Sequence, residues 1–239
     1  MIDTTSKYYP YQKTQEQFFT LEQTVFVPRM IADYLIDAPT AEYTPPDDNS
    51  YPRARLWKWL YYDGAKPLEN TLPMIGEKMS VVFDPTCPEK APTPKGYRLI
   101  PQIFIKQSQT VGQTRVHIYM GRSVPSRDDL SIAISVIFDI YTHYTYEANS
   151  ESDEYSRCLA IEQAIIESLH GVNMTGVGSF YMSKSRHPDC GSTVIYDGNT
   201  NVGRRLTMAL EISTTIDNGF GANANMPLFD NRNPNIKIL

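Results

Sequence analysis

The chain has 239 residues, a formal net charge of −5 and a pI near 5.4. Hydrophobic residues make up 41% and charged residues 21%, so most of the chain is expected to fold around a core. The acidic balance and the lack of a basic run exclude tight wrapping of nucleic acid by phosphate neutralisation. DNA that only slides past the protein would be compatible with this charge.

The cysteines and the N-terminus indicate the compartment. Cys87, Cys158 and Cys190 are widely spaced and form no CxxC pair, which argues against a disulfide framework or a structural zinc site. The N-terminus lacks a basic region followed by an apolar one, and no apolar run approaches the roughly 20 residues that span a bilayer. We expect a chain that folds in a reducing cytoplasm, with no membrane partner.

Residues 1–38 are predicted to form an N-terminal helical segment or arm. Apolar residues recur at helical spacing over 14–21 and 25–37, and Pro28 suits a first helical turn. The helical pattern ends at Ala38-Pro39, where a run of turn-forming residues begins.

Residues 39–96 are predicted to be a proline-rich insertion that contains one aromatic element. Prolines cluster near 45–52 and again at 85–94, where they exclude regular structure. Between them lies the most aromatic stretch of the chain, 55–62, which we expect to be a short element packed on the core. Both of its tryptophans, Trp57 and Trp59, are expected to be partly buried.

Residues 97–216 are predicted to form an α+β core, in which helices flank a mostly antiparallel sheet with long loop insertions and extended terminal arms around it. Apolar and polar residues alternate with the period of half-buried strands. The predicted strands lie around Ile103 and Ile105, at 116–120, 130–143, 177–183, 193–196 and 206–213, with turns at 111–113 and 197–199.

A helix is predicted over about residues 153–170. Hydroxyl and carboxylate side chains at 149–154 suit a helix N-terminus, where the dipole favours negative charge. Gly171 stands where a left-handed residue would end the helix. Large apolar residues become few after Asp217, so residues 217–239 are predicted to be a C-terminal arm that becomes ordered by contact.

The ionisable residues do not form a catalytic or metal-binding pattern. Asp139 and His143 share one strand face, but strand geometry separates them by about 13 Å, beyond hydrogen-bond reach. We interpret them as a polar strand face at a subunit contact or in water. The run His187-Pro188-Asp189-Cys190 lacks the further ligands that zinc requires. We therefore assign no catalytic residue, no metal ligand and no cofactor.

The densest positive spots are Arg53 with Arg55 and Arg204 with Arg205. The first pair precedes the two tryptophans, and such a patch can stack on single-stranded nucleic acid. Because the chain is acidic and the patch is short, salt bridges between subunits are the favoured interpretation. The interface candidates are Arg53, Arg55, Trp57, Trp59, Asp139, His143, Arg204, Arg205, Phe220 and Phe229.

Four stretches of the C-terminal block carry a resemblance to a known class of proteins. They are the long strand 130–143, the helical run 157–166, the turn region 169–178 and residues 201–206, which enter the last strand. In this order of elements and turns, the chain resembles the tail-completion, tail-terminator and neck (head-tail connector) proteins of tailed bacteriophages. The resemblance covers residues 97–215 at most.

The resemblance implies a virion protein without enzymatic activity. Such proteins form a homo-oligomeric ring, a hexamer or a dodecamer, that joins the capsid-portal complex to the tail and gives a channel for DNA. The implied partners are other copies of the chain, neighbouring neck, portal and tail-tube proteins, and genomic DNA in transit. A ring also gives sheet edges and arms a closed partner, which prevents open-ended aggregation.

Two other classes remain open. A nucleic-acid-binding module would use Arg53, Arg55 and the two tryptophans, and would show steeply salt-dependent binding. A small cytoplasmic enzyme would build its pocket from the aromatic segment 56–62 and Asp139. That alternative requires acid and base groups that converge within hydrogen-bond distance.

Overall fold

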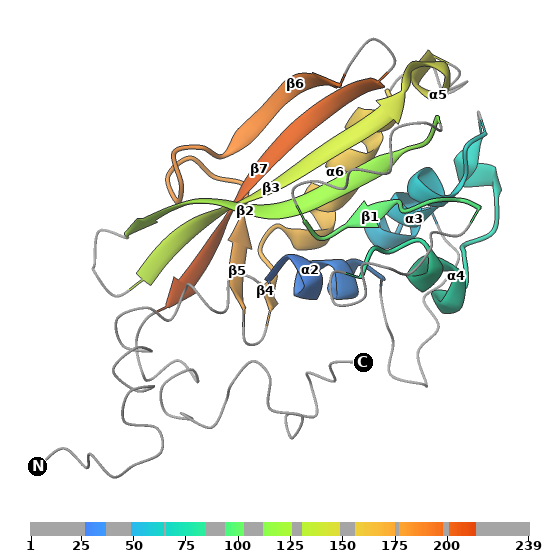
Figure 1. The fold of residues 1–239 in the computed structure, drawn as a ribbon. Coiled ribbons are helices and arrows are strands. Elements are labelled where there is room, and N and C mark those ends of the chain that lie inside the picture. Colours follow the sequence, from blue (N-terminus) through green and yellow to red (C-terminus); the bar gives the residue numbers. More distant parts are fainter. Residues whose placement is uncertain are drawn as a thin grey trace, which may run out of the picture.

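The computed structural model describes residues 27–36, 49–64, 66–84, 94–102, 112–125, 131–148, 156–174, 177–197 and 201–213 (Figure 1). Its helices are α2 (Val27–Ile36), α3 (Pro52–Tyr61), the 3-10 helix η1 (Pro67–Glu69), α4 (Ile75–Ser80), α5 (Tyr144–Ala148) and α6 (Arg157–Leu169). Its strands are β1 (Leu99–Ile100), β2 (Arg115–Pro125), β3 (Ser131–His143), β4 (Asn173–Met174), β5 (Gly178–Tyr181), β6 (Gly191–Asp197) and β7 (Asn201–Ser213).

The described strands form one sheet in the order β1-β2-β3-β7-β5-β4, and β6 pairs with β7 beside β5. Strand β7 is central, because it pairs with β3 along its whole length and with both β5 and β6 on its other edge. All of these pairings are antiparallel except β1 with β2. The predicted α+β class with a mostly antiparallel sheet is therefore confirmed.

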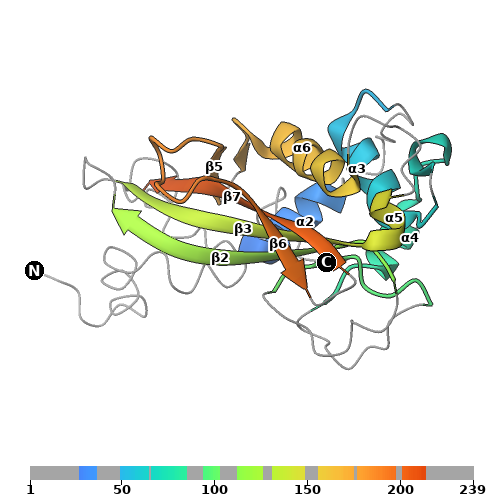
Figure 2. The ribbon, with the colours of Figure 1, turned by 90° about the horizontal axis from the view of Figure 1, so that it is seen from above.

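The main hydrophobic core of the described residues lies between the sheet and helices α2, α3 and α6, which pack on the same side of it (Figure 2). Every second residue of the long strands points into this core, as the period-two pattern predicts. From β3 and β7 these are Ile134, Val136, Phe138, Ile140, Leu206, Met208, Leu210 and Ile212. Helix α6 meets them with residues three or four apart, including Ile161, Ile165 and Leu169.

Helices α2 and α3 belong to the same core as the sheet. Ile31 and Leu35 of α2 and Trp57 of α3 are fully buried in the same cluster as the strand residues. Residues from the predicted helical arm, the predicted insertion and the predicted core therefore share one packed interior.

The tryptophans correct the expectation of partial burial, because Trp57 and Trp59 are only 0% and 5% exposed. Two residues apart on a helix, they point in different directions. The indole N–H of Trp57 donates to the Leu35 carbonyl of α2 at 2.6 Å, whereas Trp59 packs under the guanidinium of Arg157 of α6. Both rings are buried because α3 has neighbours on two sides.

Helix α6 begins later than predicted and ends as predicted. Its first residue is Arg157, and the hydroxyl of the N-cap Ser156 accepts the Leu159 N–H at 3.1 Å, which satisfies a donor that the first turn leaves free. At the other end Gly171 has a φ of +78°, the left-handed conformation that stops the helix. The predicted capping residues 149–154 lie outside the described residues.

Several other predictions also lie outside the described residues. They concern the segment 14–21, the prolines at 45–46 and 85–92, the strand around Ile103 and Ile105, the turn residue Val111, and the arm 217–239 with Phe220 and Phe229. Strand β2 pairs with β3 on one edge, and the described strand on its other edge is β1, which runs parallel to it.

Two cysteines in the described residues give a chemical test of the core. Cys158 and Cys190 are free and buried, and burial raises the pKa of the Cys158 thiol to about 12 and raises the pKa of Cys190 as well. Because the thiolate is the reactive form, we expect neither to react with a thiol reagent at about pH 8 in the native protein. The measurement is a thiol count in C87S before and after adding denaturant. A reactive thiol in native C87S would contradict this packing.

Candidate interaction surface

The face of the sheet opposite the helices carries a grid of side chains that we call the helix-free patch. Helices α2, α3 and α6 pack on the other face (Figure 2). Strand register places His117, Asp139 and Arg205 in one row across β2, β3 and β7. The patch consists of His117, Tyr119, Ile137, Asp139, Tyr141 and Arg205.

Asp139 is the centre of the patch and is only 5% exposed. Its carboxylate accepts two hydrogen bonds from the Arg205 guanidinium, from Nε at 2.7 Å and from Nη2 at 2.8 Å. It accepts a third from the Tyr119 hydroxyl at 2.8 Å. A bidentate arginine and a phenol thus satisfy a carboxylate that would otherwise be costly to bury.

These contacts change the proton affinity of both partners. Burial, and then the hydrogen bond to Asp139, raises the pKa of Tyr119. The hydrogen bond to Asp139 raises the pKa of Arg205. The Arg205 side chain is nevertheless 43% exposed, so its guanidinium, held by Asp139, places a positive charge at the surface.

We expect Tyr119 to resist ionisation in the folded state. Its pKa lies above the unfolded value of about 10, so its contribution to stability is present below about pH 10 and is lost as the pH rises further. The variant Y119F should therefore show a weaker loss of unfolding free energy above about pH 10. The ultraviolet titration of native tyrosines should have the same amplitude up to about pH 11 in both proteins, and a smaller amplitude in Y119F would contradict the assignment.

Gly203 of β7 permits close packing beside the patch. A Cβ at this position would lie 2.6 Å from the Ile140 carbonyl oxygen, 2.9 Å from Tyr141 Cδ1 and 3.0 Å from Ile195 Cγ1. A larger residue would clash with the backbone of β3 and with both side chains, so glycine lets Tyr141 lie close to β7.

The segment 182–190 covers another part of the same face. It links β5 to β6 and reaches back to β2, where His187 Nε2 lies 3.1 Å from the Arg122 carbonyl oxygen. The Ser135 hydroxyl donates to the same carbonyl at 3.0 Å, next to a bulge in β2 between Met120 and Ser123. The run that contains His187 and Cys190 thus packs within the fold. Within the described ranges, no group of three or more His, Cys, Asp or Glu is placed to hold a metal ion.

Three of the four predicted interface arginines pair with carboxylates of the same chain. Arg55 pairs with Glu167 of α6, and Arg205 pairs with Asp139. Arg204 binds Glu162 of α6, and its Nη2 donates to the Ser192 hydroxyl at 2.8 Å. Salt bridges expected between subunits are therefore formed inside one subunit, because α6 and β3 carry acidic residues at matching positions.

The remaining candidates do not form one site. Trp57 and Trp59 are buried, so their rings are not presented for stacking on bases. The aromatic segment 56–62 lies on the helix side of the sheet, whereas the Asp139 carboxylate lies on the other, so the two do not converge as the enzyme alternative requires. His143 is bound by its neighbour, the Thr145 hydroxyl, at 2.8 Å, and not by Asp139.

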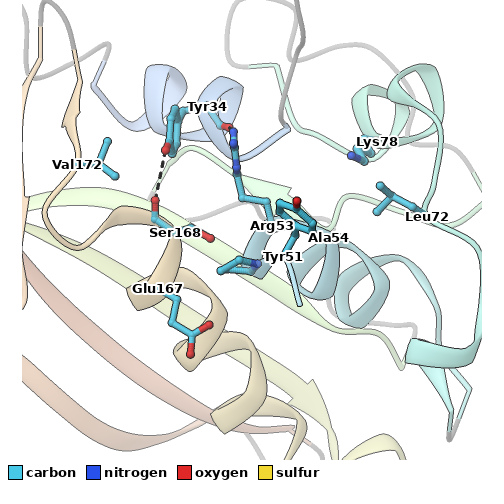
Figure 3. Close-up of a pocket in the computed structure, with 10 residues that line it drawn as sticks. Tyr34, Tyr51, Arg53, Ala54, Leu72, Lys78, Glu167, Ser168 and Val172 are labelled. Carbon is cyan, nitrogen blue, oxygen red and sulfur yellow. Dashed lines mark hydrogen bonds between the residues drawn. The ribbon is translucent and has the colours of Figure 1, made fainter. Parts of the chain in front are cut away.

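A small pocket lies where α2, α3 and α6 meet (Figure 3). Its volume is about 240 Å³, below the roughly 300–1,000 Å³ of typical ligand pockets. Arg53 crosses it, with its guanidinium 4.9 Å from the Tyr34 ring centroid and a hydrogen bond to the Tyr34 carbonyl at 3.3 Å. The Tyr34 hydroxyl in turn donates to the Ser168 carbonyl at 3.4 Å (Figure 3). These contacts join three helices, which indicates a packing role for Arg53.

Sequence reasoning missed Tyr119, Ile137 and Tyr141 as parts of a surface. Each occupies an outward position of a predicted strand, and this position is the only sequence feature that could have assigned them to a surface. Their proximity to Arg205 follows only from the pairing of β3 with β2 and β7.

Comparison with known proteins gives the family. The family model YomW matches residues 54–210, more than half of the chain. This family is phage-derived. No curated protein and no solved structure matches. Among the described helices, none has the length and apolar character to cross a membrane. With a family match that takes in most of α3, all of α6 and most of the sheet, the chain belongs to the YomW family.

Proposed function

We propose that the protein is a structural component of a phage virion that forms a ring at the neck or tail, as a tail terminator or a head-tail connector. The observation that carries the proposal is the helix-free patch on a member of a phage-derived family. In this proposal, the ring joins the capsid-portal complex to the tail.

The composition of the patch suits a contact between proteins. Tyr119, Ile137 and Tyr141 are neither fully buried nor fully exposed, so each has apolar surface left to cover. Interfaces are enriched in tyrosine and arginine. Because Asp139 already holds Arg205 in place, little side-chain entropy is lost when Arg205 binds a neighbour. A contact between this patch and a different surface of the next copy would close a ring.

The proposed channel agrees with the charge of the chain. A net charge of −5 disfavours tight, sequence-independent binding of phosphates, so DNA would pass through the ring without being held. Weak binding to DNA at physiological salt is the expected result, and tight, steeply salt-dependent binding would favour a nucleic-acid-binding module instead.

Two measurements test the proposal. Class-averaged electron micrographs of the purified protein should show a closed ring with a central hole, and mass spectrometry of purified virions should detect the chain. A compact monomer at high concentration, or absence from the virion, counts against it.

One variant tests whether the patch forms the ring. I137E puts a charge among the apolar side chains of the patch and should open the ring while circular dichroism stays unchanged. M74E is the matched control, because Met74 is 77% exposed and lies in α4's N-cap, away from the sheet. An intact ring in I137E would show that another surface joins the copies.

A truncation tests the predicted C-terminal arm. Removing residues 217–239 should leave a folded core, because the truncated chain keeps every described strand. Assembly should weaken, because the predicted arm is then missing. The readout is native mass spectrometry, and an unchanged oligomer would argue against the arm as a strap between subunits.

A further inference from the structure

Among the described strands, β6 forms a regular open edge of the sheet. It pairs with β7 over 7 residues, from Gly191 with Thr207 to Asp197 with Asn201, without a register shift. No other described strand pairs with its opposite edge. In an antiparallel edge strand, alternate residues point their N–H and C=O groups outward, where another strand can bind them.

The other described edges of the sheet are protected. Strand β2 has a bulge after Met120 and ends at Pro125, and both features discourage pairing. Beside β1, Val82 forms a bridge to Leu99 and the Phe83 N–H donates to the Leu99 carbonyl at 2.9 Å. Strand β4 has only 2 residues. By contrast, β6 contains no proline, lysine, arginine or bulge.

Strand β6 also presents apolar side chains beside a neutralised charge. Val194 and Tyr196 are 52% and 74% exposed, and they share one face of the strand. The residue opposite Val194 in β7 is Arg204, whose guanidinium is bound by Glu162. Covering this region would therefore bury apolar surface without leaving an unpaired arginine.

We propose that β6 pairs with β6 of a second copy, antiparallel, around a two-fold axis. Pairing of β6 with a different edge is disfavoured, because the described sheet has no second unprotected strand of similar length. A strand that pairs with its own copy under two-fold symmetry is antiparallel to it. The two sheets then continue into one.

The full-length pairing fixes the contacts at the axis. When residues 191–197 of both copies pair completely, Val194 faces Val194 of the second copy, and Tyr196 faces Ser192 of the second copy. Each exposed apolar side chain thus gains a cross-strand partner, which is the unit of sheet stabilisation.

The pairing does not depend on the proposed ring, because the β6 edge and the helix-free patch are different surfaces. If hexameric rings form through the patch, β6 contacts would join two rings into a dodecamer. If no ring forms, the β6 contact alone would give a dimer.

The test uses a charge swap at the axis in the full-length chain. V194K and V194E each place two like charges opposite one another, which is destabilising in a cross-strand pair. Native mass spectrometry should show that each variant has half the wild-type oligomer mass, with a dissociation midpoint shifted by about tenfold or more. M74K serves as a control, since it adds the same charge at an exposed apolar residue away from β6.

Mixing the two variants separates a lost contact from a damaged fold. An equimolar mixture of V194K and V194E should restore the wild-type mass, because opposite charges then meet at the axis, whereas a misfolded variant would not be rescued. The proposal is overturned if V194K keeps the wild-type mass, if the mixture stays at half mass, or if the wild-type protein is monomeric. A wild-type dimer without a ring would support the β6 contact and count against the proposed ring.

Discussion

Replacing Trp57 by alanine is expected to lower the free energy of unfolding by about 3–5 kcal/mol, the usual cost of removing a buried aromatic side chain. Trp57 is 0% exposed, and its ring packs in the core that α2 and α3 share with the sheet. The change also removes the hydrogen bond from the indole N–H to the Leu35 carbonyl of α2. Urea denaturation followed by circular dichroism measures the loss.

Two further variants separate the loss of buried volume from the loss of the indole N–H and from the effect of changing an exposed aromatic residue. W57F keeps most of the apolar volume and loses the indole N–H, so it should cost about 1–3 kcal/mol. Y51A changes an aromatic residue that is 46% exposed, at the start of the same helix, and should stay within about 0.5–1 kcal/mol of wild type. Equal losses in W57A and Y51A would mean that α3 does not pack as described.

Replacing Arg157 by leucine is expected to destabilise the fold by about 3–5 kcal/mol, because the fold loses two hydrogen bonds from a fully buried, charged donor. The Arg157 guanidinium donates to the Tyr62 carbonyl at 3.0 Å and to the Gly64 carbonyl, and it lies 5.4 Å from the ring centroids of Trp59 and Tyr146. Leucine fills part of the space but makes neither hydrogen bond, and it loses the contact of the guanidinium with the two rings. The Arg157 side chain is 0% exposed, and this burial lowers its pKa.

Arg186 offers a matched control for this prediction. It also forms an ion pair, with Glu211 at 2.8 Å, and lies over an aromatic ring, but its side chain is 48% exposed. A surface pair of this kind contributes about 0–1 kcal/mol, so R186L should have a small effect. R157K, which keeps the charge but loses the planar fork, should fall between the two leucine variants. A loss in R157L no larger than that in R186L would contradict the buried role.

Local patterns were enough to predict much of the fold. The alternation in 130–143 predicts β3 almost to the residue, and Gly171 marks the end of α6 because the left-handed conformation is specific to few residues. The start of α6 was predicted too early, since the stretch before it is rich in capping residue types and only the geometry selects Ser156. The first residue of a helix depends on which of several capping side chains accepts a hydrogen bond from a free N–H of the first turn.

Tertiary contacts account for what the sequence could not show. The burial of Trp57 and Trp59 requires that α2 and α6 flank α3, and no local period encodes this. Asp139 and Arg205 were both interface candidates, yet their ion pair depends on the register of β3 with β7. Tyr119 is one of 16 tyrosines, and nothing in its neighbours along the chain singles it out.

The helices near the start of the chain depend on partners that are synthesised much later. The Arg157 bond to the Tyr62 carbonyl spans 95 residues, and the bond between Tyr34 and the Ser168 carbonyl spans 134 residues. At about 5–20 residues per second, a ribosome needs roughly 5–27 seconds to make these intervening segments. During this delay α2 and α3 lack the surface that buries their apolar faces. Translation therefore leaves α2 and α3 accessible to chaperones and proteases until α6 has been made.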